Sequence, residues 1–335
     1  MATQRAAGTA SMRGDRKICV LTVPETLIAE KSELREKILN VIRQIDQRLE
    51  SQHRIKLDFS RVRRIYPGGM LILLAALRRQ TDRHPRKIQA RCPPQSLSAQ
   101  LLNHFGIARA LGIKPHLSHP RHSSVTGWQH LSGTQADGPQ VKRLLDQYRD
   151  NTQAELPDEL FLVLTEGLSN VCHHAYPSDC EIEAKHRKWW LFARLDEPSF
   201  DRSGSIYIAI YDLGVGIPGT LRSKLKVGEI ALNALDKASE LVGLSEGTRL
   251  DQRLLKTAIE NPRTQTGQAH RGKGLPEMRE FAASTDGGRL HIVSGQAQYS
   301  MHGGKPDGQL QGFDEKFPGT LLLWNLPLKT KEQPA

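Results

Sequence analysis

A helix-forming segment near the middle of the chain, residues 157–175, carries a carboxylate and a carboxamide one turn apart. Glu166 and Asn170 lie on its polar side with His173, because residues three or four apart share a helix face. The opposite face is apolar and is formed by Leu160, Val163, Leu164, Gly167, Leu168 and Val171. An oxygen pair of this kind suits a hard cation such as Mg²⁺, together with a base that orients a water. Taken alone, the pattern favours the ordinary alternative, a solvated polar face.

A second polar group follows a strand-like segment, residues 206–211, in which β-branched and aromatic residues alternate. Asp212 comes directly after it, and Gly214 and Gly216 come next. A carboxylate in this place can accept a hydrogen bond from an exocyclic amine, and glycine allows close approach of a ligand or another backbone. The alternative is a tight turn that ends the strand, which needs the glycines but not Asp212.

A third segment leads into a helix predicted over residues 275–283. It contains Gly272 and Gly274, flanked by Arg271 and Lys273. Glycines before a helix expose backbone N–H groups at the positive end of the helix dipole, which forms a cradle for an anion. The segment lacks the full Walker pattern, so by itself it is a weak indication of a nucleotide.

Thr320 opens the last predicted strand and completes a set of four segments. Their order along the chain resembles the GHKL ATPase family, which includes gyrase, histidine kinases and the anti-sigma serine kinases. The resemblance covers about residues 140–328. The matching segments are 166–175 for the family's N-box, 212–218 for its first glycine box and 271–275 for its second.

The resemblance implies an Mg-ATP site of the Bergerat type, with a role for each matching residue. Asn170 would ligate the Mg²⁺ that bridges the phosphates, and Glu166 would orient or deprotonate the attacking water or hydroxyl. Asp212 would accept a hydrogen bond from the adenine amine, with Thr320 assisting through a water. The glycines would allow close approach, Gly214 and Gly216 beside the base and Gly272 and Gly274 at the phosphates.

The resemblance also implies a movable cover for this site. Residues 219–270, mostly helical by spacing, would form an ATP lid whose closure excludes water. Lys273 or Arg271 would neutralise charge on the γ-phosphate, although the family does not fix a basic residue there. His174 would support the nucleotide pocket or pack beneath it.

Zinc is the alternative ligand for Cys172, His173, His174 and Cys180. Successive side chains on a helix diverge by about 100°, so the three neighbouring residues cannot all face one ion, and we expect no zinc site. The four cysteines of the chain form no CxxC pair, which is typical of a reduced, cytoplasmic protein.

The first part of the chain alternates strand-like and helix-like segments, which predicts a second α/β domain. The order of these segments, with Leu57–Ser60 leading into Tyr66–Gly69, resembles a STAS domain, the fold of anti-sigma-factor antagonists. The phosphoacceptor serine of those antagonists would lie near Tyr66–Gly69, where this chain has none. We therefore expect this domain to dock a partner without being phosphorylated at that place.

The predicted fold class is α/β (α+β), a C-terminal Bergerat-type α/β sandwich preceded by a smaller STAS-like α/β domain. The predicted divisions are a disordered tail over 1–14, the STAS-like domain over 15–117, a linker over 118–138 and the ATP-binding domain over 139–330. A chain of 335 residues suffices for two such domains. It has no apolar run of about 18 residues, so no membrane span is predicted.

Positive charge is concentrated in the N-terminal part. Residues 1–120 hold 22 Lys/Arg and 9 Asp/Glu, a net charge of +13, whereas residues 121–335 hold 25 and 27, a net charge of −2. Such a field attracts nucleic acid, an acidic protein or anionic lipid, although a solvated basic surface is the favoured interpretation. Aromatic residues are scarce there, so a platform for stacked bases is not expected.

The sequence thus predicts an Mg-ATP-binding regulatory protein, either a serine/threonine protein kinase of the anti-sigma type or a slow ATPase. A non-catalytic switch, in which ATP changes the surface offered to a partner, is the alternative. A nucleic-acid binder is a less favoured one. We expect a regulatory protein partner of unidentified nature and no membrane partner, and leave a homodimer open.

Overall fold

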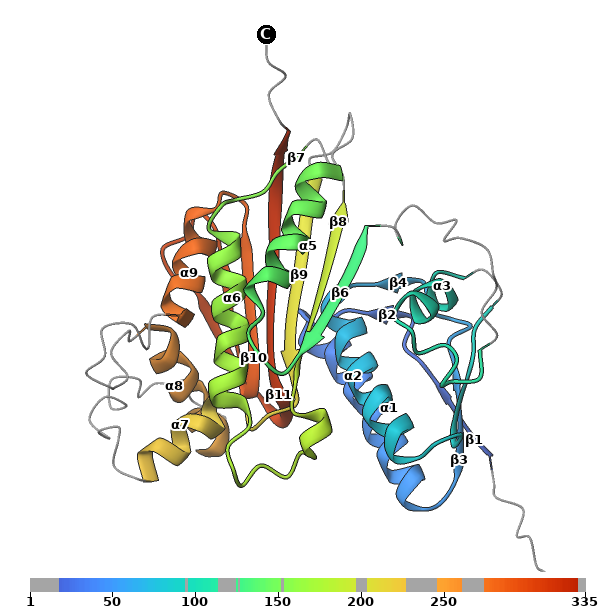
Figure 1. Cartoon of the computed structure of the whole chain (residues 1–335). Helices are drawn as coiled ribbons and strands as arrows, with labels where there is room; N and C mark the ends of the chain where they lie inside the picture. Colours follow the sequence, from blue (N-terminus) through green and yellow to red (C-terminus); the bar gives the residue numbers. More distant parts are fainter. Residues whose placement is uncertain are drawn as a thin grey trace, which may run out of the picture.

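The computed structural model describes residues 18–93, 96–113, 125, 127–151, 154–196, 204–226, 246–260 and 274–330 (Figure 1). The tail predicted over residues 1–14 lies outside them. The described part combines helices with parallel and antiparallel sheets, so the predicted α/β (α+β) class is confirmed. None of the described helices is long and apolar enough to cross a membrane.

The N-terminal half is built on three parallel strands in the order β1-β3-β5. Helices connect these strands, because parallel strands need long crossover connections. The elements are β1 (Ile18–Thr22), α1 (Ser32–Glu50), β3 (Arg54–Asp58), α2 (Pro67–Arg83), β5 (Ile88–Arg91) and α3 (Leu97–His104). Two short strands, β2 (Thr26–Leu27) and β4 (Arg64–Ile65), form a separate parallel pair.

The C-terminal half holds an antiparallel sheet in the order β10-β11-β9-β8-β6. Its strands are β6 (Trp128–Gly133), β8 (Trp189–Asp196), β9 (Gly204–Asp212), β10 (Arg289–His302) and β11 (Gln309–Thr330), and the short β7 (Ala154–Glu155) pairs with the end of β11. In this register, Asp212 at the end of β9 lies between Thr320 of β11 and Trp189 of β8.

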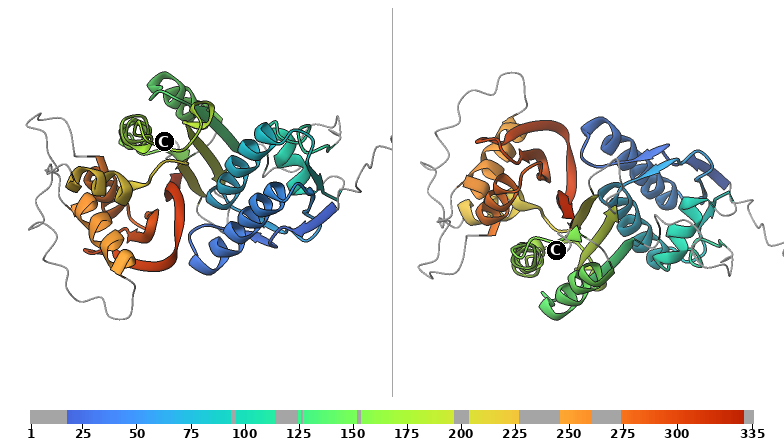
Figure 2. Two further views of the ribbon diagram at one scale, coloured as in Figure 1. Left: turned by 90° about the horizontal axis from the view of Figure 1, so that it is seen from below. Right: turned by 90° about the horizontal axis from the view of Figure 1, so that it is seen from above.

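Helices cover one face of this sheet (Figures 1 and 2). They are α5 (Gly138–Asn151), α6 (Leu160–Asn170), α8 (Glu246–Glu260) and α9 (Gly274–Ser284), with α7 (Ile217–Lys226) beside α8. A π-helical turn, η1 (Val171–Ala175), continues α6, and a short 3-10 turn, η2 (Ala184–His186), precedes β8. Leu164, Ile210 and Met278 belong to the buried cluster that joins these helices to the sheet.

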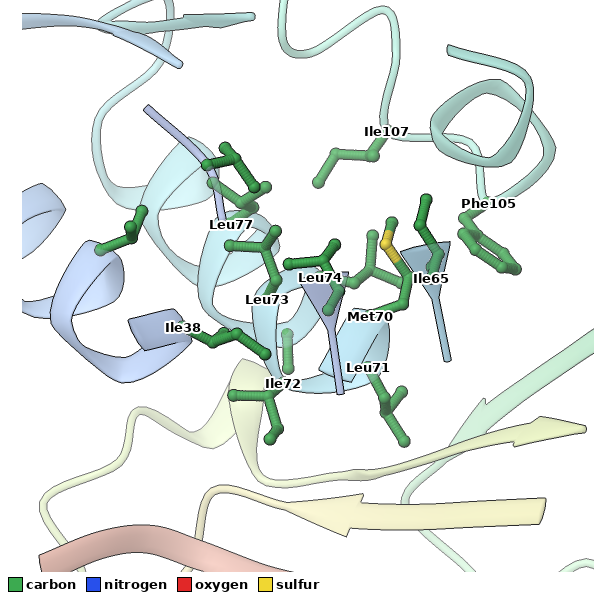
Figure 3. Packing of buried hydrophobic residues seen from close by; sticks show 14 of the residues in the cluster. Ile38, Ile65, Met70, Leu71, Ile72, Leu73, Leu74, Leu77, Phe105 and Ile107 are labelled. Atoms are coloured by element: carbon green, nitrogen blue, oxygen red, sulfur yellow. The ribbon is translucent and has the colours of Figure 1, made fainter. Parts of the chain in front are cut away.

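The other face of the six-stranded sheet is covered by the N-terminal half. One buried cluster includes Ile38 of α1 and Leu71 of α2, both labelled in Figure 3. The same cluster includes Tyr211 of β9 and Leu323 of β11. The approach is close, because a Cβ added to Gly68 of α2 would lie 2.6 Å from Leu323 Cδ2. The described residues therefore form four layers: helices, the six-stranded sheet, α1 with α2, and the three-stranded sheet.

Residues 68–77 of helix α2 are apolar on all sides, because this part of the helix lies between the two sheets. Pro67 begins it at a position where the missing N–H costs no helical hydrogen bond, and residues 68–75 are buried without interruption. A helix of this composition is stable only when it is surrounded by protein. Figure 3 shows Leu71 and Ile72 on the side of the six-stranded sheet and Leu77 on the opposite side.

The apolar residues of the segment 26–50 have helical spacing, but helix α1 begins only at Ser32. Thr26 and Leu27 form β2 instead, and Leu27 O accepts the Tyr66 N–H at 2.9 Å just before α2. This backbone pairing satisfies groups that a helix starting at Thr26 would have satisfied internally.

The prediction of a linker over residues 118–138 is wrong for residues 128–133. Residues 128–133 form β6, which adds an edge strand to the six-stranded sheet. Trp128 is buried against Phe105 and Phe192, so an aromatic contact compensates for the weak strand pattern of the surrounding polar residues.

Candidate functional site

Asp212 ends β9 with its side chain almost completely buried, at 2% exposure. Its Oδ1 accepts the Gly214 N–H at 2.7 Å. Burial raises the pKa of Asp212 to about 7, while the backbone N–H groups of Gly214 and Thr320 lower it. No cation of the described residues contributes to this balance. The carboxyl is therefore a buried acceptor that titrates near neutral pH.

The loop after Asp212 needs both of its predicted glycines. A Cβ on Gly214 would overlap the Ala175 carbonyl oxygen, and Gly216 has a φ of +80°, which L side chains rarely adopt. The Val215 N–H between them donates to Ala175 O at 2.9 Å. The loop is thus tied to the end of the π-helical turn that continues α6.

Ser294, a residue that the sequence analysis did not identify, joins three parts of the site. Its buried Oγ accepts the Ile217 N–H at 2.8 Å and lies 3.2 Å from Gly319 O and 3.0 Å from Thr320 Oγ1. A hydroxyl has one proton. If Ser294 donates it to Gly319 O, then Thr320 donates to Ser294, and the lone pairs of Thr320 stay free to accept.

Gly319 and Thr320 lie beside Asp212. Gly319 has a φ of +81°, and a Cβ there would overlap the Asp212 carbonyl oxygen. This close approach of β11 to the end of β9 brings Thr320 into register with Asp212. The two side chains together offer hydrogen-bond acceptors at one end of the sheet.

Glu166 lies on α6 against the first residue of α9. A Cβ on Gly274 would overlap the Glu166 side chain from Oε1 to Cγ, so a larger residue there would displace the Glu166 carboxylate. The pKa of Glu166 is raised by burial and by the negative charge of Glu277, and lowered by His173. A raised pKa makes a carboxylate a better proton acceptor near neutral pH.

Helix α6 also links Glu166 to the Asp212 end of the sheet. A Cβ on Gly167 would lie 2.9 Å from Ile210 Cδ1, and Ile210 is two residues before Asp212 on β9. The small residue beside Glu166 therefore lets α6 pack closely on the strand that carries Asp212.

Asn170 is the last residue of α6 and is half-buried. The α-helix predicted to residue 175 changes there to the π-helical turn, because Ala175 O turns to the Val215 N–H of the glycine loop. His173 Nδ1 lies 3.1 Å from Ser169 Oγ. Turns of this kind often occur at functional sites.

His174 does not pack beneath the site, so this part of its prediction is wrong. Its side chain is exposed, and its backbone carbonyl accepts the Thr220 hydroxyl of α7 at 3.0 Å.

Two helices of the predicted lid, α7 and α8, are described and are helical as expected. Asp251 of α8 holds them to the sheet: Oδ1 accepts from Arg222 Nη2 of α7 at 2.6 Å, and Oδ2 accepts the Gln296 N–H of β10 at 2.8 Å. The rest of the predicted lid, residues 227–245 and 261–270, lies outside the described residues. So do Arg271, Gly272 and Lys273.

The described residues bring the predicted site residues together in two groups. One group gathers at the end of β9 and comprises Asp212, Gly214, Gly216 and Thr320. The other pairs Glu166 with Gly274 between α6 and α9, with Asn170 one turn further along α6. Within the described part of the chain, no three His, Cys, Asp or Glu residues are placed to hold a metal ion.

Comparisons with protein-family models, with curated proteins and with solved structures gave no match.

Proposed function

We propose that this chain binds Mg-ATP in a GHKL-type (Bergerat) pocket between the six-stranded sheet and the helices α6 and α9. The observation that carries the proposal is Asp212, a carboxyl buried at the end of β9 with only backbone N–H partners in the described residues. Burying a carboxylate costs free energy unless donors compensate it. An adenine amine would be such a donor.

The base would lie at the Asp212 end of the sheet. Asp212 Oδ2 and the lone pairs of Thr320 Oγ1 both accept, so they match the two N–H groups of an exocyclic amine. Gly214 and Gly216 let the loop pass close to Ala175 and Ser294, which holds Asp212 in place at this end of the sheet. Guanine has a carbonyl oxygen in the corresponding place, which two acceptors would repel.

The phosphates would extend toward Glu166 and the start of α9. Asn170 supplies one carboxamide oxygen, which fits an Mg²⁺ ion that takes its other ligands from phosphates and waters. The ion would neutralise phosphate charge during the reaction. Gly274 and the preceding Gly272 would let backbone amides reach the phosphates at the helix end.

Catalysis would depend on Glu166. With its pKa raised, it would orient or deprotonate the nucleophile, either a water or the hydroxyl of a partner protein. We therefore propose a slow ATPase or a serine/threonine protein kinase of the anti-sigma type, acting in the cytoplasm on a protein partner.

The catalytic proposal is tested with γ-labelled ATP, comparing the wild type with Glu166→Gln. Glu280→Gln, on the exposed side of α9, is the matched control. Wild type and control should release or transfer the label, and Glu166→Gln should lose at least about a hundredfold of that rate. Equal rates in Glu166→Gln and wild type would exclude Glu166 as the base.

A second candidate is a non-catalytic switch, favoured by the bonds of Asp251 that hold α7 and α8 to β10. In this case ATP would shift the population of lid conformations without being consumed. Hydrogen exchange of residues 217–226 and 246–260 should slow when Mg-ATP is added, while the label stays on ATP. Exchange that ATP leaves unchanged would rule the switch out.

A further inference from the structure

The three-stranded sheet of the N-terminal half has one face buried and one face exposed. Leu21, Ile55 and Leu57 point inward to α1 and α2. The residues between them point the other way, because side chains alternate along a strand. We call this outward surface the open face, formed by Ile18, Val20, Thr22, Arg54, Lys56, Asp58, Gln89 and Arg91.

In the part of the chain that the structure describes, no element covers this open face, which is unusual for a parallel sheet. Sheets made only of parallel strands have helices on both faces in nearly all proteins. Here β1 and β3 lie beyond α1 and α2 at the right-hand side of Figure 1, and the outward apolar side chains are well exposed, Ile18 at 60% and Val20 at 58%. These are two of the three large apolar side chains exposed in the described residues.

The open face has two zones with different chemistry. Its edge strand β1 offers Ile18 and Val20, whereas the neighbouring β3 offers Arg54 and Lys56 directly opposite them in register. Arg91 of β5 lies opposite Asp58 of β3 in register, so the basic zone is centred on Arg54 and Lys56. A covering element would therefore need an apolar side over β1 and an acidic side over Arg54 and Lys56 of β3.

The two zones of the open face disfavour a second copy of the chain and nucleic acid as its occupants. A second copy packed face to face would bring the basic zone against an equally basic surface. The open face carries no aromatic residue on which bases could stack, and nucleic acid would leave the apolar zone uncovered.

We propose that the open face of the β1-β3-β5 sheet is a docking surface for an acidic amphipathic helix of a partner protein. The helix places an apolar stripe on Ile18 and Val20 and acidic side chains on Arg54 and Lys56. This adds the second helical layer that the described residues do not supply to these parallel strands. The surface lies on the side of the sheet that faces away from the six-stranded sheet, so it is separate from the proposed nucleotide site.

The probe is an 18-residue helical peptide with leucines on one stripe and glutamates on the adjoining side, titrated into the full-length protein by fluorescence anisotropy. Binding should weaken by about tenfold or more in the double variant Arg54→Glu, Lys56→Glu, and should also weaken with added salt. Val20→Thr, which keeps a residue suited to a strand, should weaken it through the apolar zone alone.

The control variant Lys142→Glu, Arg143→Glu makes the same change of charge on the exposed side of α5 and should leave binding unchanged. Circular dichroism checks that each variant is folded. The proposal is overturned if the peptide does not bind, or if both double variants weaken it equally. It is also overturned if a 20-nucleotide single-stranded DNA, an anionic vesicle or a second copy of the chain occupies the surface more tightly than the peptide.

Discussion

At the scale of single residues, Asp212 has the most unusual environment in the candidate site. A carboxyl that is buried without a described cation titrates near neutral pH, with its pKa raised from 3.8 to about 7. Between these values the folded chain keeps the proton and the unfolded chain releases it. The contribution to stability is therefore full below pH 3.8, decreases as the pH rises to about 7, and stays constant above that.

This gives a prediction for pH dependence. Asp212→Asn should remove the loss of stability that the wild type shows between about pH 5 and about pH 8, since asparagine does not titrate. Urea unfolding at the two pH values measures the difference. Asp286→Asn, at an exposed acid of the turn before β10, should keep the wild-type dependence, and an unchanged dependence in Asp212→Asn would contradict the assigned burial.

A second prediction at the scale of single residues concerns the buried hydroxyl of Ser294. Ser294→Ala leaves the Ile217 N–H and Gly319 O without their buried partner and should cost about 1–3 kcal/mol of unfolding free energy. It should also reduce the preference for Mg-ATP over Mg-GTP, because Thr320 is then free to donate. Ser300→Ala, on the same strand and less buried, is the control; an ATP preference unchanged by Ser294→Ala would show that the hydroxyl does not orient Thr320.

At the scale of elements, the site depends on how closely α6 meets α9. Gly274→Ala would push its new Cβ into Glu166, and a displaced base should lower the rate of γ-phosphate loss by about a hundredfold. Gly138→Ala is the control, because its Cβ would meet Phe161 at an ordinary 3.6 Å. A wild-type rate in Gly274→Ala would show that the position of Glu166 does not matter to the reaction.

A second prediction at the scale of elements concerns the attachment of α7 and α8 to β10. Asp251→Ala removes the bonds to Arg222 and Gln296 and should weaken the local structure by about 1.5–3 kcal/mol. Hydrogen exchange in α7 and α8 should then become faster while β9 keeps its protection. Equal acceleration in β9 would indicate general destabilisation, and no acceleration in α7 would show that Asp251 does not hold it.

At the scale of the whole molecule, the two halves share one core. Because α2 is buried against both sheets, the halves should unfold together. Gly68→Val adds atoms where only 2.6 Å is available and should cost about 1–3 kcal/mol. All four tryptophans lie after residue 120, so their fluorescence reports on the C-terminal half. In Gly68→Val, the unfolding transition followed by tryptophan fluorescence should move to a lower urea concentration than in the wild type. The transition followed by far-UV circular dichroism should move with it, and two separate transitions would contradict a shared core.

The sequence allows the α/β class and most helices and strands to be predicted, because periodicity and turn residues are local signals. Residues 68–75 even show that α2 is buried on all sides, yet they cannot show that its second neighbour is the six-stranded sheet. Ser294 was missed for the same reason: a serine in an apolar strand is visible in the sequence, but its partners Ile217 and Gly319 are distant along the chain. Strand β6 was missed because its pairing with β8 compensates for a weak local pattern.

The most direct test of the proposed function is calorimetric titration of Mg-ATP into wild type and Asp212→Asn, with Asp286→Asn as control. Wild type and control should bind one ATP per chain. Asp212→Asn should bind about 10 to 100 times more weakly, because a charged acceptor for the adenine amine is lost. ATP binding of equal strength to wild type and Asp212→Asn, or no binding to the wild type, would contradict a nucleotide site centred on Asp212.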